Sequence, residues 1–356
     1  MALSLFLIGA PRAGKTTVFQ ALTNTPEGPH FSTKGSHHLG TVKVPDARLE
    51  ALRDMYQPKK FTPAEVTFVD VNLPPSSDGS SSIGQLTTFL GDADAFVMVV
   101  QGFGDMDYRG KPLDPAAQLE SVVLELAVAD LEKVEKRLER IDHERKRGLK
   151  VNAQEAAALE KAKGVLEAGR PLRGLDLPVE EEKTLRSLQF LSMKPALVVV
   201  NVEEGNAAGQ GLEGLKKMAE GWGFQSLVFC APLEAEMAQL DAQAQAEFLK
   251  DYGLQEPART RLIQAAYRLL DLISFFTVGE DEVRAWTIRR GTGAQSAAGK
   301  VHSDIERGFI RAETVASAEL LKTRSWAACR ENATLRLEGK TYEVQDGEVL
   351  HFRFNA

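Results

Sequence analysis

Residues near the start of the chain have the types and spacing needed to hold a nucleotide phosphate. They read G-x-x-x-x-G-K-T, in which glycines let the backbone curl around an anion and loop N–H groups face it. Lys15 can reach the β- and γ-phosphates, and the Thr16 hydroxyl can bind Mg²⁺. The nucleotide-binding residues predicted here are Gly9, Ala10, Pro11, Arg12, Ala13, Gly14, Lys15, Thr16 and Thr17.

The elements around this loop are those that the motif needs. The apolar run 3–8 predicts a strand before the loop, and Val18, Phe19 and Leu22 predict a helix after it. Strand, glycine loop and helix together predict the α/β architecture of a P-loop NTPase with a G-type domain.

Two downstream segments could complete a Mg²⁺ site. The polar loop 24–34 contains Thr33, which we predict as a metal ligand, although an ordinary loop threonine remains an alternative. The predicted strand 64–70 ends in Asp70, where P-loop NTPases use a carboxylate to hold metal-bound water. His37 and His38 lie in a polar stretch and are predicted to be solvated.

A third element should contact the base. The buried run 195–201 ends at Asn201, where G-type domains place N-K-x-D to bind guanine. Val202 stands in place of the Lys and Glu204 in place of the Asp, which argues against strict GTP specificity. The loop at Cys230 and Ala231, which follows the next predicted strand, is expected to border the base.

The segment after Asp70 departs from the usual D-x-x-G pattern. Leu73 occupies the glycine position, and Pro74 and Pro75 follow it. A glycine there would offer a flexible N–H to the γ-phosphate, so its absence weakens the case for nucleotide-dependent switching.

The periodicity of apolar residues changes near residue 118. Leu119, Val122, Leu126 and Val128 begin a run at helical spacing, which predicts a coiled-coil-like helical hairpin inserted into the G domain. Its tip would lie near four basic residues, Arg145, Lys146, Arg147 and Lys150. These could form a solvated loop, or they could contact RNA phosphates.

The C-terminal part predicts a small β-grasp module. Segments 274–279 and 282–288 form a hairpin-like pair, and a helix is expected over 294–302. Segments 340–344 and 348–354 flank Asp346-Gly347, a tight-turn signal, with Leu350, Phe352 and Phe354 expected to face inward. The predicted domains are 1–117 and 194–272 (G domain), 118–193 (helical hairpin) and 273–356 (C-terminal module).

Composition limits the class of protein. The chain has 356 residues, 43% of them apolar, and a formal net charge of −7, so it is not a broadly basic nucleic-acid binder, and we expect no recognition of DNA sequence. Cys230 and Cys329 are expected to be reduced thiols in a cytoplasmic protein. We expect no signal peptide and no membrane span.

Longer motifs carry a resemblance to a known family. The stretches GAPRAGKT, GTVKVPDARLEAL, QPKKFTPAEVTFVDV, NVEE and DGEVLHFRFN, with the long segment that begins FFTVGEDEVRAWTIRRGTG, resemble the YchF family of Obg-like ATPases over essentially the whole chain. The resemblance implies a G domain, an inserted helical coiled coil and a C-terminal TGS domain with a ubiquitin-like β-grasp fold. It also implies ATP preferred over GTP, with Mg²⁺ as cofactor and Asn201 and Glu204 as the N-x-x-E base element.

The resemblance further implies association with ribosomes in translation or stress regulation. The hairpin tip and the TGS domain are then the expected contacts with the ribosome or the RNA of its large subunit. We expect a slow ATPase, in which Lys15 is the catalytic residue of the phosphate loop. A nucleotide-gated binding module that scarcely hydrolyses and a scaffold with a vestigial site are the alternatives.

One departure from the family lies in the loop itself. Arg12 stands where the family usually has Asn, the residue that in related GTPases binds an activating potassium ion. We hypothesise that the Arg12 guanidinium replaces this potassium ion near the phosphates. Together with the altered segment after Asp70, this departure suggests a divergent paralogue.

Overall fold

The computed structural model describes residues 3–24, 37–71 and 87–355. Contacts divide the chain into two compact units, Met1–Gly40 with Thr67–Leu262 and Thr41–Val66 with Ile263–Ala356. The first unit thus contains both the candidate site and the helical insertion. Because this division does not separate them, the four domain ranges predicted from the sequence stay a prediction.

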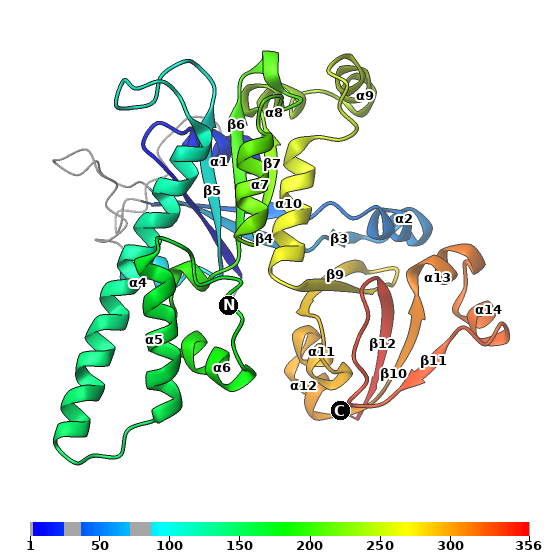
Figure 1. Cartoon of the computed structure of the whole chain (residues 1–356). Coiled ribbons are helices and arrows are strands. Elements are labelled where there is room, and N and C mark those ends of the chain that lie inside the picture. The colour runs from blue at the N-terminus through cyan, green and yellow to red at the C-terminus, as the bar shows by residue number, and fades with distance from the viewer. Residues whose placement is uncertain (1–2, 25–36, 72–86, 356) are drawn as a thin grey trace. The chain divides into compact units, whose positions relative to one another are not determined.

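A six-stranded sheet forms the centre of the first unit, with the strand order β2-β4-β1-β5-β6-β7 (Figure 1). Its pairs β4–β1, β1–β5, β5–β6 and β6–β7 are parallel, as expected for an α/β fold with crossover helices. The strands are β1 (Ser4–Ile8), β2 (His37–Lys43), β4 (Glu65–Val71), β5 (Ala95–Gly102), β6 (Ala196–Val202) and β7 (Gln225–Phe229).

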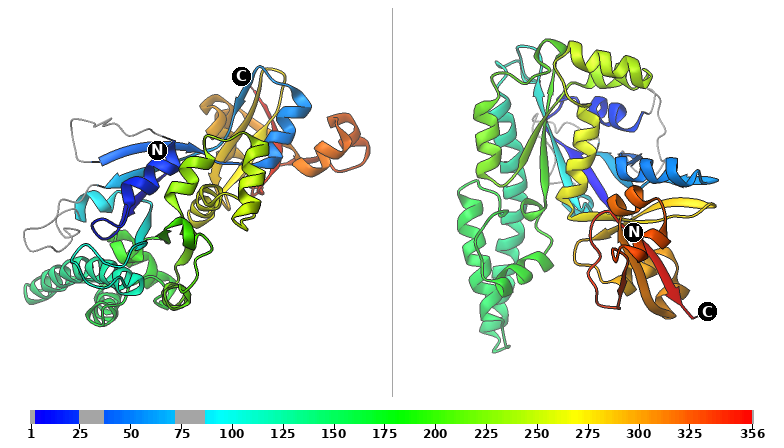
Figure 2. Two further views of the ribbon diagram at one scale, coloured as in Figure 1. Left: turned by 90° about the horizontal axis from the view of Figure 1, so that it is seen from above. Right: turned by 90° about the vertical axis from the view of Figure 1, so that its right-hand side faces the viewer.

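Helices cover both faces of this sheet. Residues 96–100 of β5 and all of β6 are buried, which is why both segments read as continuous apolar runs. In the right-hand view of Figure 2, α4 and α7 lie on one side of the sheet and α1 on the other. The helices of this unit are α1 (Lys15–Thr23), α3 (Thr87–Gly91), α4 (Pro115–Lys146), α5 (Ala153–Glu167), α6 (Val179–Ser187), η2 (Leu191–Met193), η3 (Glu204–Asn206), α7 (Glu213–Gly221), α8 (Ala231–Met237) and α9 (Ala242–Asp251), and α10 (Ala258–Leu269) begins here.

The predicted helical hairpin is present as α4 and α5, which lie side by side (Figure 2). Asp114 caps α4 by accepting from the N–H groups of Ala116 and Ala117, and Asn152 caps α5 in the same way. The two helices and α6 share an apolar core separate from that of the sheet. Val128, which the sequence places in the same apolar run, is 49% exposed and lies outside this core.

The second unit is built on another six-stranded sheet, with the order β11-β10-β12-β8-β9-β3. Its strands are β3 (Lys60–Thr62), β8 (Leu272–Thr277), β9 (Glu282–Arg289), β10 (Phe309–Ala316), β11 (Arg336–Glu338) and β12 (Glu348–Phe354). Its helices are α2 (Ala47–Tyr56), α11 (Ala294–Val301), α12 (Ser303–Arg307), α13 (Ser317–Thr323) and α14 (Trp326–Glu331). The predicted β8–β9 hairpin and the helix at 294–302 are both confirmed.

The tight turn predicted at Asp346-Gly347 is present, but the prediction that it joins two strands is wrong. Residues 340–344 are not a strand; β12 pairs antiparallel with β10 and parallel with β8. Asp346 instead accepts from the Ser274 N–H at 2.9 Å and from Arg48 at 2.8 Å, and Gly347 adopts a positive φ of 82°. The turn therefore docks β12 against β8. Phe354, predicted to face inward, is 42% exposed.

Two further findings concern the cysteines and the apolar character of the described helices. Cys230 and Cys329 are both free and buried. None of the described helices combines the length and the apolar character needed to cross a membrane.

Candidate nucleotide site

The phosphate loop has the strand, loop and helix that the sequence predicts. It connects β1 to α1, and the first of its two glycines, Gly9, has a φ of 151°. A Cβ atom on Gly9 would lie 2.1 Å from the Val99 carbonyl oxygen. Gly14 has a φ of 86°, and a Cβ there would lie 2.2 Å from the Asn201 side-chain nitrogen. Both positions therefore require glycine.

Lys15 lies across this loop. Its Nζ donates to the carbonyl oxygens of Gly9 and Ala10, each at 3.0 Å. Burial lowers the pKa of the Lys15 ammonium, and the negative charge of Asp70 opposes that shift. Gly14, which precedes α1, offers no side-chain cap, so its first-turn N–H groups can face an anion.

Thr16 and Asp70 come together although 54 residues separate them. The Thr16 hydroxyl donates to Asp70 Oδ2 at 2.8 Å, and Asp70 is 1% exposed. Asp70 Oδ1 is buried and has no hydrogen-bond partner among the described residues. The Thr16 hydroxyl oxygen and the two Asp70 carboxylate oxygens, of which Oδ1 is unsatisfied, fit the ligand chemistry of Mg²⁺. Thr33 and Leu73 lie outside the described residues.

His38 is a neighbour of this metal position that sequence reasoning missed. His37 and His38 begin β2 and are not the solvated loop residues that we predicted. His38 Nδ1 lies 3.4 Å from Asp70 Oδ2, and the His37 ring packs 4.8 Å from that of Phe89. The polar sequence around these two histidines gives little signal of a strand.

The base element is joined to the loop by Asn201, which is 4% exposed. Asn201 Nδ2 donates to the Ala13 carbonyl at 3.4 Å, and its Oδ1 accepts from the Ala231 N–H at 3.4 Å. One amide therefore links the phosphate loop to the start of α8. This brings three predicted parts of the site together.

The other predicted base residues differ in exposure. Val202 is 1% exposed and packs in the core of the sheet, whereas Glu204 is exposed in η3. Burial raises the pKa of the Cys230 thiol, and the charge of Glu204 adds to this rise.

Arg12 and Thr17 are exposed, and Arg12 has a positive φ of 60°. A positive φ is uncommon for a residue with a side chain, so the loop holds Arg12 in a conformation that favours Gly or Asn. The backbone at this position would therefore also suit the asparagine that the family resemblance leads us to expect there.

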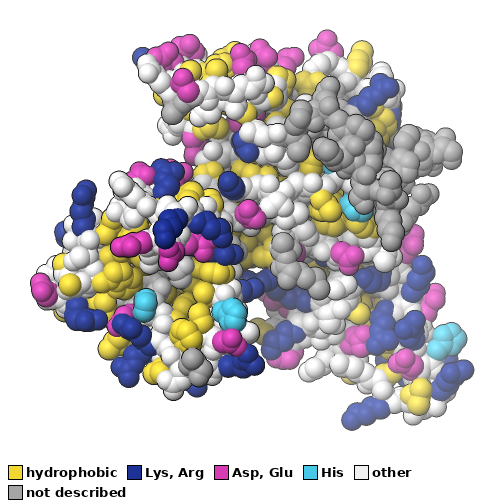
Figure 3. Space-filling model, turned by 180° about the vertical axis from the view of Figure 1, so that it is seen from behind, with side chains coloured by type: hydrophobic (Ala, Val, Ile, Leu, Met, Phe, Trp, Pro, Cys, Tyr) yellow, Lys and Arg dark blue, Asp and Glu magenta, His cyan; other side chains and the backbone are white. Residues whose placement is uncertain are grey.

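The tip of the helical hairpin is basic. Arg145, Lys146, Arg147 and Lys150 are all exposed, and Lys146 pairs with Asp142 at 2.5 Å. Dark blue side chains gather at the end of the helical insertion in Figure 3. A contact of this tip with RNA phosphates stays a prediction.

Comparisons with known proteins cover the whole chain. A family model named YchF-GTPase_C, described as a protein of unknown function (DUF933), matches residues 272–355. The ribosome-binding ATPase YchF of Bacillus subtilis (strain 168) is 38% identical over 366 residues, which cover 100% of both chains. Its counterpart from Escherichia coli O157:H7 is 37% identical over 98% of each chain. The solved structure of the Schizosaccharomyces pombe YchF GTPase superposes with a TM-score of 0.83 at 29% identity, covering 99% of this chain and 97% of that one.

Proposed function

Because the chain belongs to the YchF family of Obg-like ribosome-binding ATPases, we propose that it binds ATP with Mg²⁺, hydrolyses it slowly and associates with the ribosome in the cytoplasm. One observation carries the nucleotide part of this proposal. The buried Asn201 amide contacts both the phosphate loop and Ala231, so the phosphate and base elements form one site.

The residues of the site have distinct parts in this chemistry. Loop N–H groups and the Lys15 ammonium bind and orient the phosphates, which otherwise repel an attacking nucleophile. Thr16 and Asp70 would hold Mg²⁺, and the ion would neutralise charge on the β- and γ-phosphates. The buried position of Asp70 keeps its carboxylate fixed for this purpose.

We expect ATP to bind more tightly than GTP when both are titrated side by side with Mg²⁺. The lysine and aspartate that serve guanine are replaced by buried Val202 and exposed Glu204, so the guanine N1–H and N2 amino group lack their usual acceptor. Isothermal titration of the full chain with each nucleotide measures the preference. Tighter binding of GTP would overturn this base assignment.

A second candidate is a nucleotide-gated binding module with little hydrolysis. Leu73 favours it, because a leucine at this position of the sequence replaces the usual glycine after Asp70. Single-turnover ATP hydrolysis, with and without ribosomes, separates the two functions. Measurable turnover supports the slow ATPase, whereas ribosome association that depends on bound ATP without turnover supports the module.

The exposed Arg12 predicts an ATPase whose rate is the same in K⁺ and in Na⁺. The guanidinium supplies a fixed positive charge where the family's Asn would recruit a potassium ion. Replacing Arg12 by Asn should therefore create a dependence on K⁺ that the original chain lacks. Rates measured in the two salts at equal ionic strength check this. A sharp rise in K⁺ for the unaltered chain would refute the idea.

A further inference from the structure

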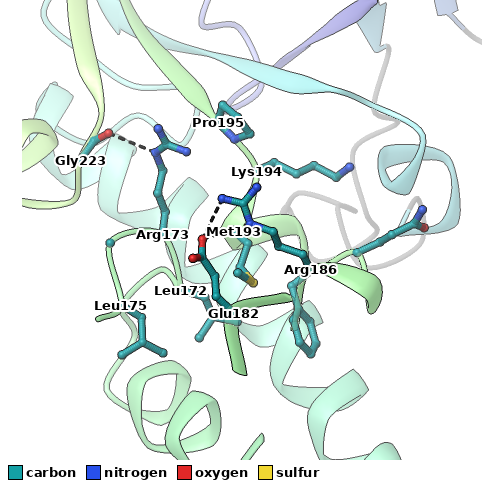
Figure 4. Close-up of a pocket in the computed structure, with 12 residues that line it drawn as sticks. Leu172, Arg173, Leu175, Glu182, Arg186, Met193, Lys194, Pro195 and Gly223 are labelled. Carbon is teal, nitrogen blue, oxygen red and sulfur yellow. Dashed lines mark hydrogen bonds and ion pairs between the residues drawn. The ribbon is translucent and has the colours of Figure 1, made fainter. Parts of the chain in front are cut away.

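A second cavity lies where the helical insertion meets the sheet of the first unit (Figure 4). Its volume is about 500 Å³. Its walls come from the loop 172–175 after α5, from α6, from residues 189–195 before β6, and from Gly223 in the turn between α7 and β7. It shares no lining residue with the phosphate loop, so it is a separate site.

Two guanidinium groups point into this cavity. Arg173 Nε donates to the Gly223 carbonyl at 3.2 Å, and Arg186 pairs with Glu182 at 2.7 Å. Figure 4 shows both side chains directed toward the same space. Arg173 and Arg186 both line the cavity. Burial lowers the pKa of Arg173, and the positive charge of Arg186 lowers it further. No carboxylate of the described residues forms an ion pair with Arg173.

Lys194 also borders the cavity, but its amine already donates hydrogen bonds to the backbone. Its Nζ donates to the carbonyl oxygens of Gly91 at 2.8 Å and Ala93 at 2.5 Å. Glu182 is the only lining carboxylate among the described residues, and its partner Arg186 has a side chain that is 72% exposed. An ion pair as exposed as this one contributes little to stability, so an incoming anion can displace Glu182 from Arg186 at small cost.

Apart from Gln189, the other side chains that line the cavity are apolar. Leu172 and Phe190 are buried at its base, and Leu175, Met193 and Pro195 are half-buried along its walls. Small-molecule sites typically enclose roughly 300–1,000 Å³ and combine apolar walls with a few convergent polar groups. A hollow of this kind fits a compact ligand better than an extended nucleic-acid backbone, which needs a continuous basic surface.

We propose that this cavity binds a small phosphate-bearing ligand of mononucleotide size. The phosphate lies between Arg173 and Arg186, where two guanidinium groups can each form charge-assisted hydrogen bonds with its oxygens. The planar or apolar remainder of the ligand packs against Leu175 and Met193. The strand β6 begins beside this cavity at Ala196 and reaches Asn201 of the nucleotide site five residues later, about 17 Å away at about 3.3 Å per residue.

The test is equilibrium dialysis of the full chain with 5′-AMP, 5′-UMP and inorganic phosphate. A saturating non-hydrolysable ATP analogue with Mg²⁺ keeps the phosphate loop filled, so the probes report on the second cavity alone. Trp222, which is half-buried next to Gly223, gives an independent fluorescence signal. A single-stranded oligouridylate of twelve nucleotides is the arm that tests for RNA.

The proposal expects mononucleotides to bind, and Arg173→Gln and Arg186→Gln each to weaken that binding about tenfold or more. Arg170→Gln changes an exposed arginine outside the cavity and should leave the affinity unchanged. Arg186 is exposed, so its substitution keeps the test valid if the Arg173 variant fails to fold.

Three results would overturn the proposal. The first is no mononucleotide binding, or binding that the two glutamine variants leave intact. The second is inorganic phosphate binding as tightly as the mononucleotides, which would mean that the apolar walls contribute nothing. The third is arginine-dependent binding of the oligouridylate alone, which would identify a surface for RNA.

Discussion

Replacing Lys15 by alanine should weaken ATP binding by about 100-fold or more, because two charge-assisted contacts to the phosphates are each worth roughly 1.5–3 kcal/mol. The Lys15 amine already lies across the loop, within 3.0 Å of the Gly9 and Ala10 carbonyl oxygens. It therefore needs little rearrangement to reach a phosphate placed against the N–H groups of the loop. Isothermal titration with Mg²⁺ and ATP measures the loss.

The fold should survive this substitution, since the lowered pKa of Lys15 indicates that burial of its charge is unfavourable. The free variant should unfold at or above the temperature of the unaltered chain, but ATP should no longer raise that temperature. Lys217→Ala removes an exposed lysine from α7 and serves as the matched control. ATP binding by the Lys15 variant at the original affinity would show that the nucleotide lies elsewhere.

The sequence could predict those parts of this site whose residues lie close together along the chain. The phosphate loop needs only β1, eight residues and α1, so its motif and context lie within the first 24 residues. The Asn201 side chain contacts Ala13, which is 188 positions away in the sequence, and Ala231, which is 30 positions away. The base motif indicated Asn201 but not these contacts. His38 was missed because its role depends on the pairing of β2, which the polar sequence around it obscures.

The second unit shows the same limit for strands. Asp346-Gly347 is the local signal of a two-residue hairpin, yet its partners are Ser274 and Arg48, 72 and 298 residues away. Contacts group the segment around Arg48 with the C-terminal residues, where β3 pairs with β9. Such pairings follow from tertiary packing, which local turn chemistry does not encode.

Asp130 is a buried carboxylate that the helical pattern of α4 conceals. It is 1% exposed and accepts three hydrogen bonds, from the Leu191 N–H at 2.8 Å, the Ser192 N–H at 2.7 Å and the Ser192 hydroxyl at 2.6 Å. Burial raises the pKa of Asp130, and the bonds from Ser192 and Leu191 oppose this rise. These contacts fasten the helical insertion to η2, directly before β6.

Replacing Asp130 by alanine should destabilise the chain by about 3–5 kcal/mol, because it leaves three buried donors without an acceptor at roughly 1–3 kcal/mol each, less what water entry recovers. Urea unfolding followed by circular dichroism measures the change. Asp142→Ala, on the same helix, removes an exposed carboxylate that pairs only with Lys146 among the described residues, and it should leave the midpoint unchanged. Equal stability of the two variants would mean that the junction of α4 with η2 is held by its apolar contacts alone. A loss of stability in the Asp130 variant alone would instead identify this carboxylate as the polar anchor that sets where the insertion meets β6. That junction borders the second cavity and lies at the start of the strand that carries Asn201.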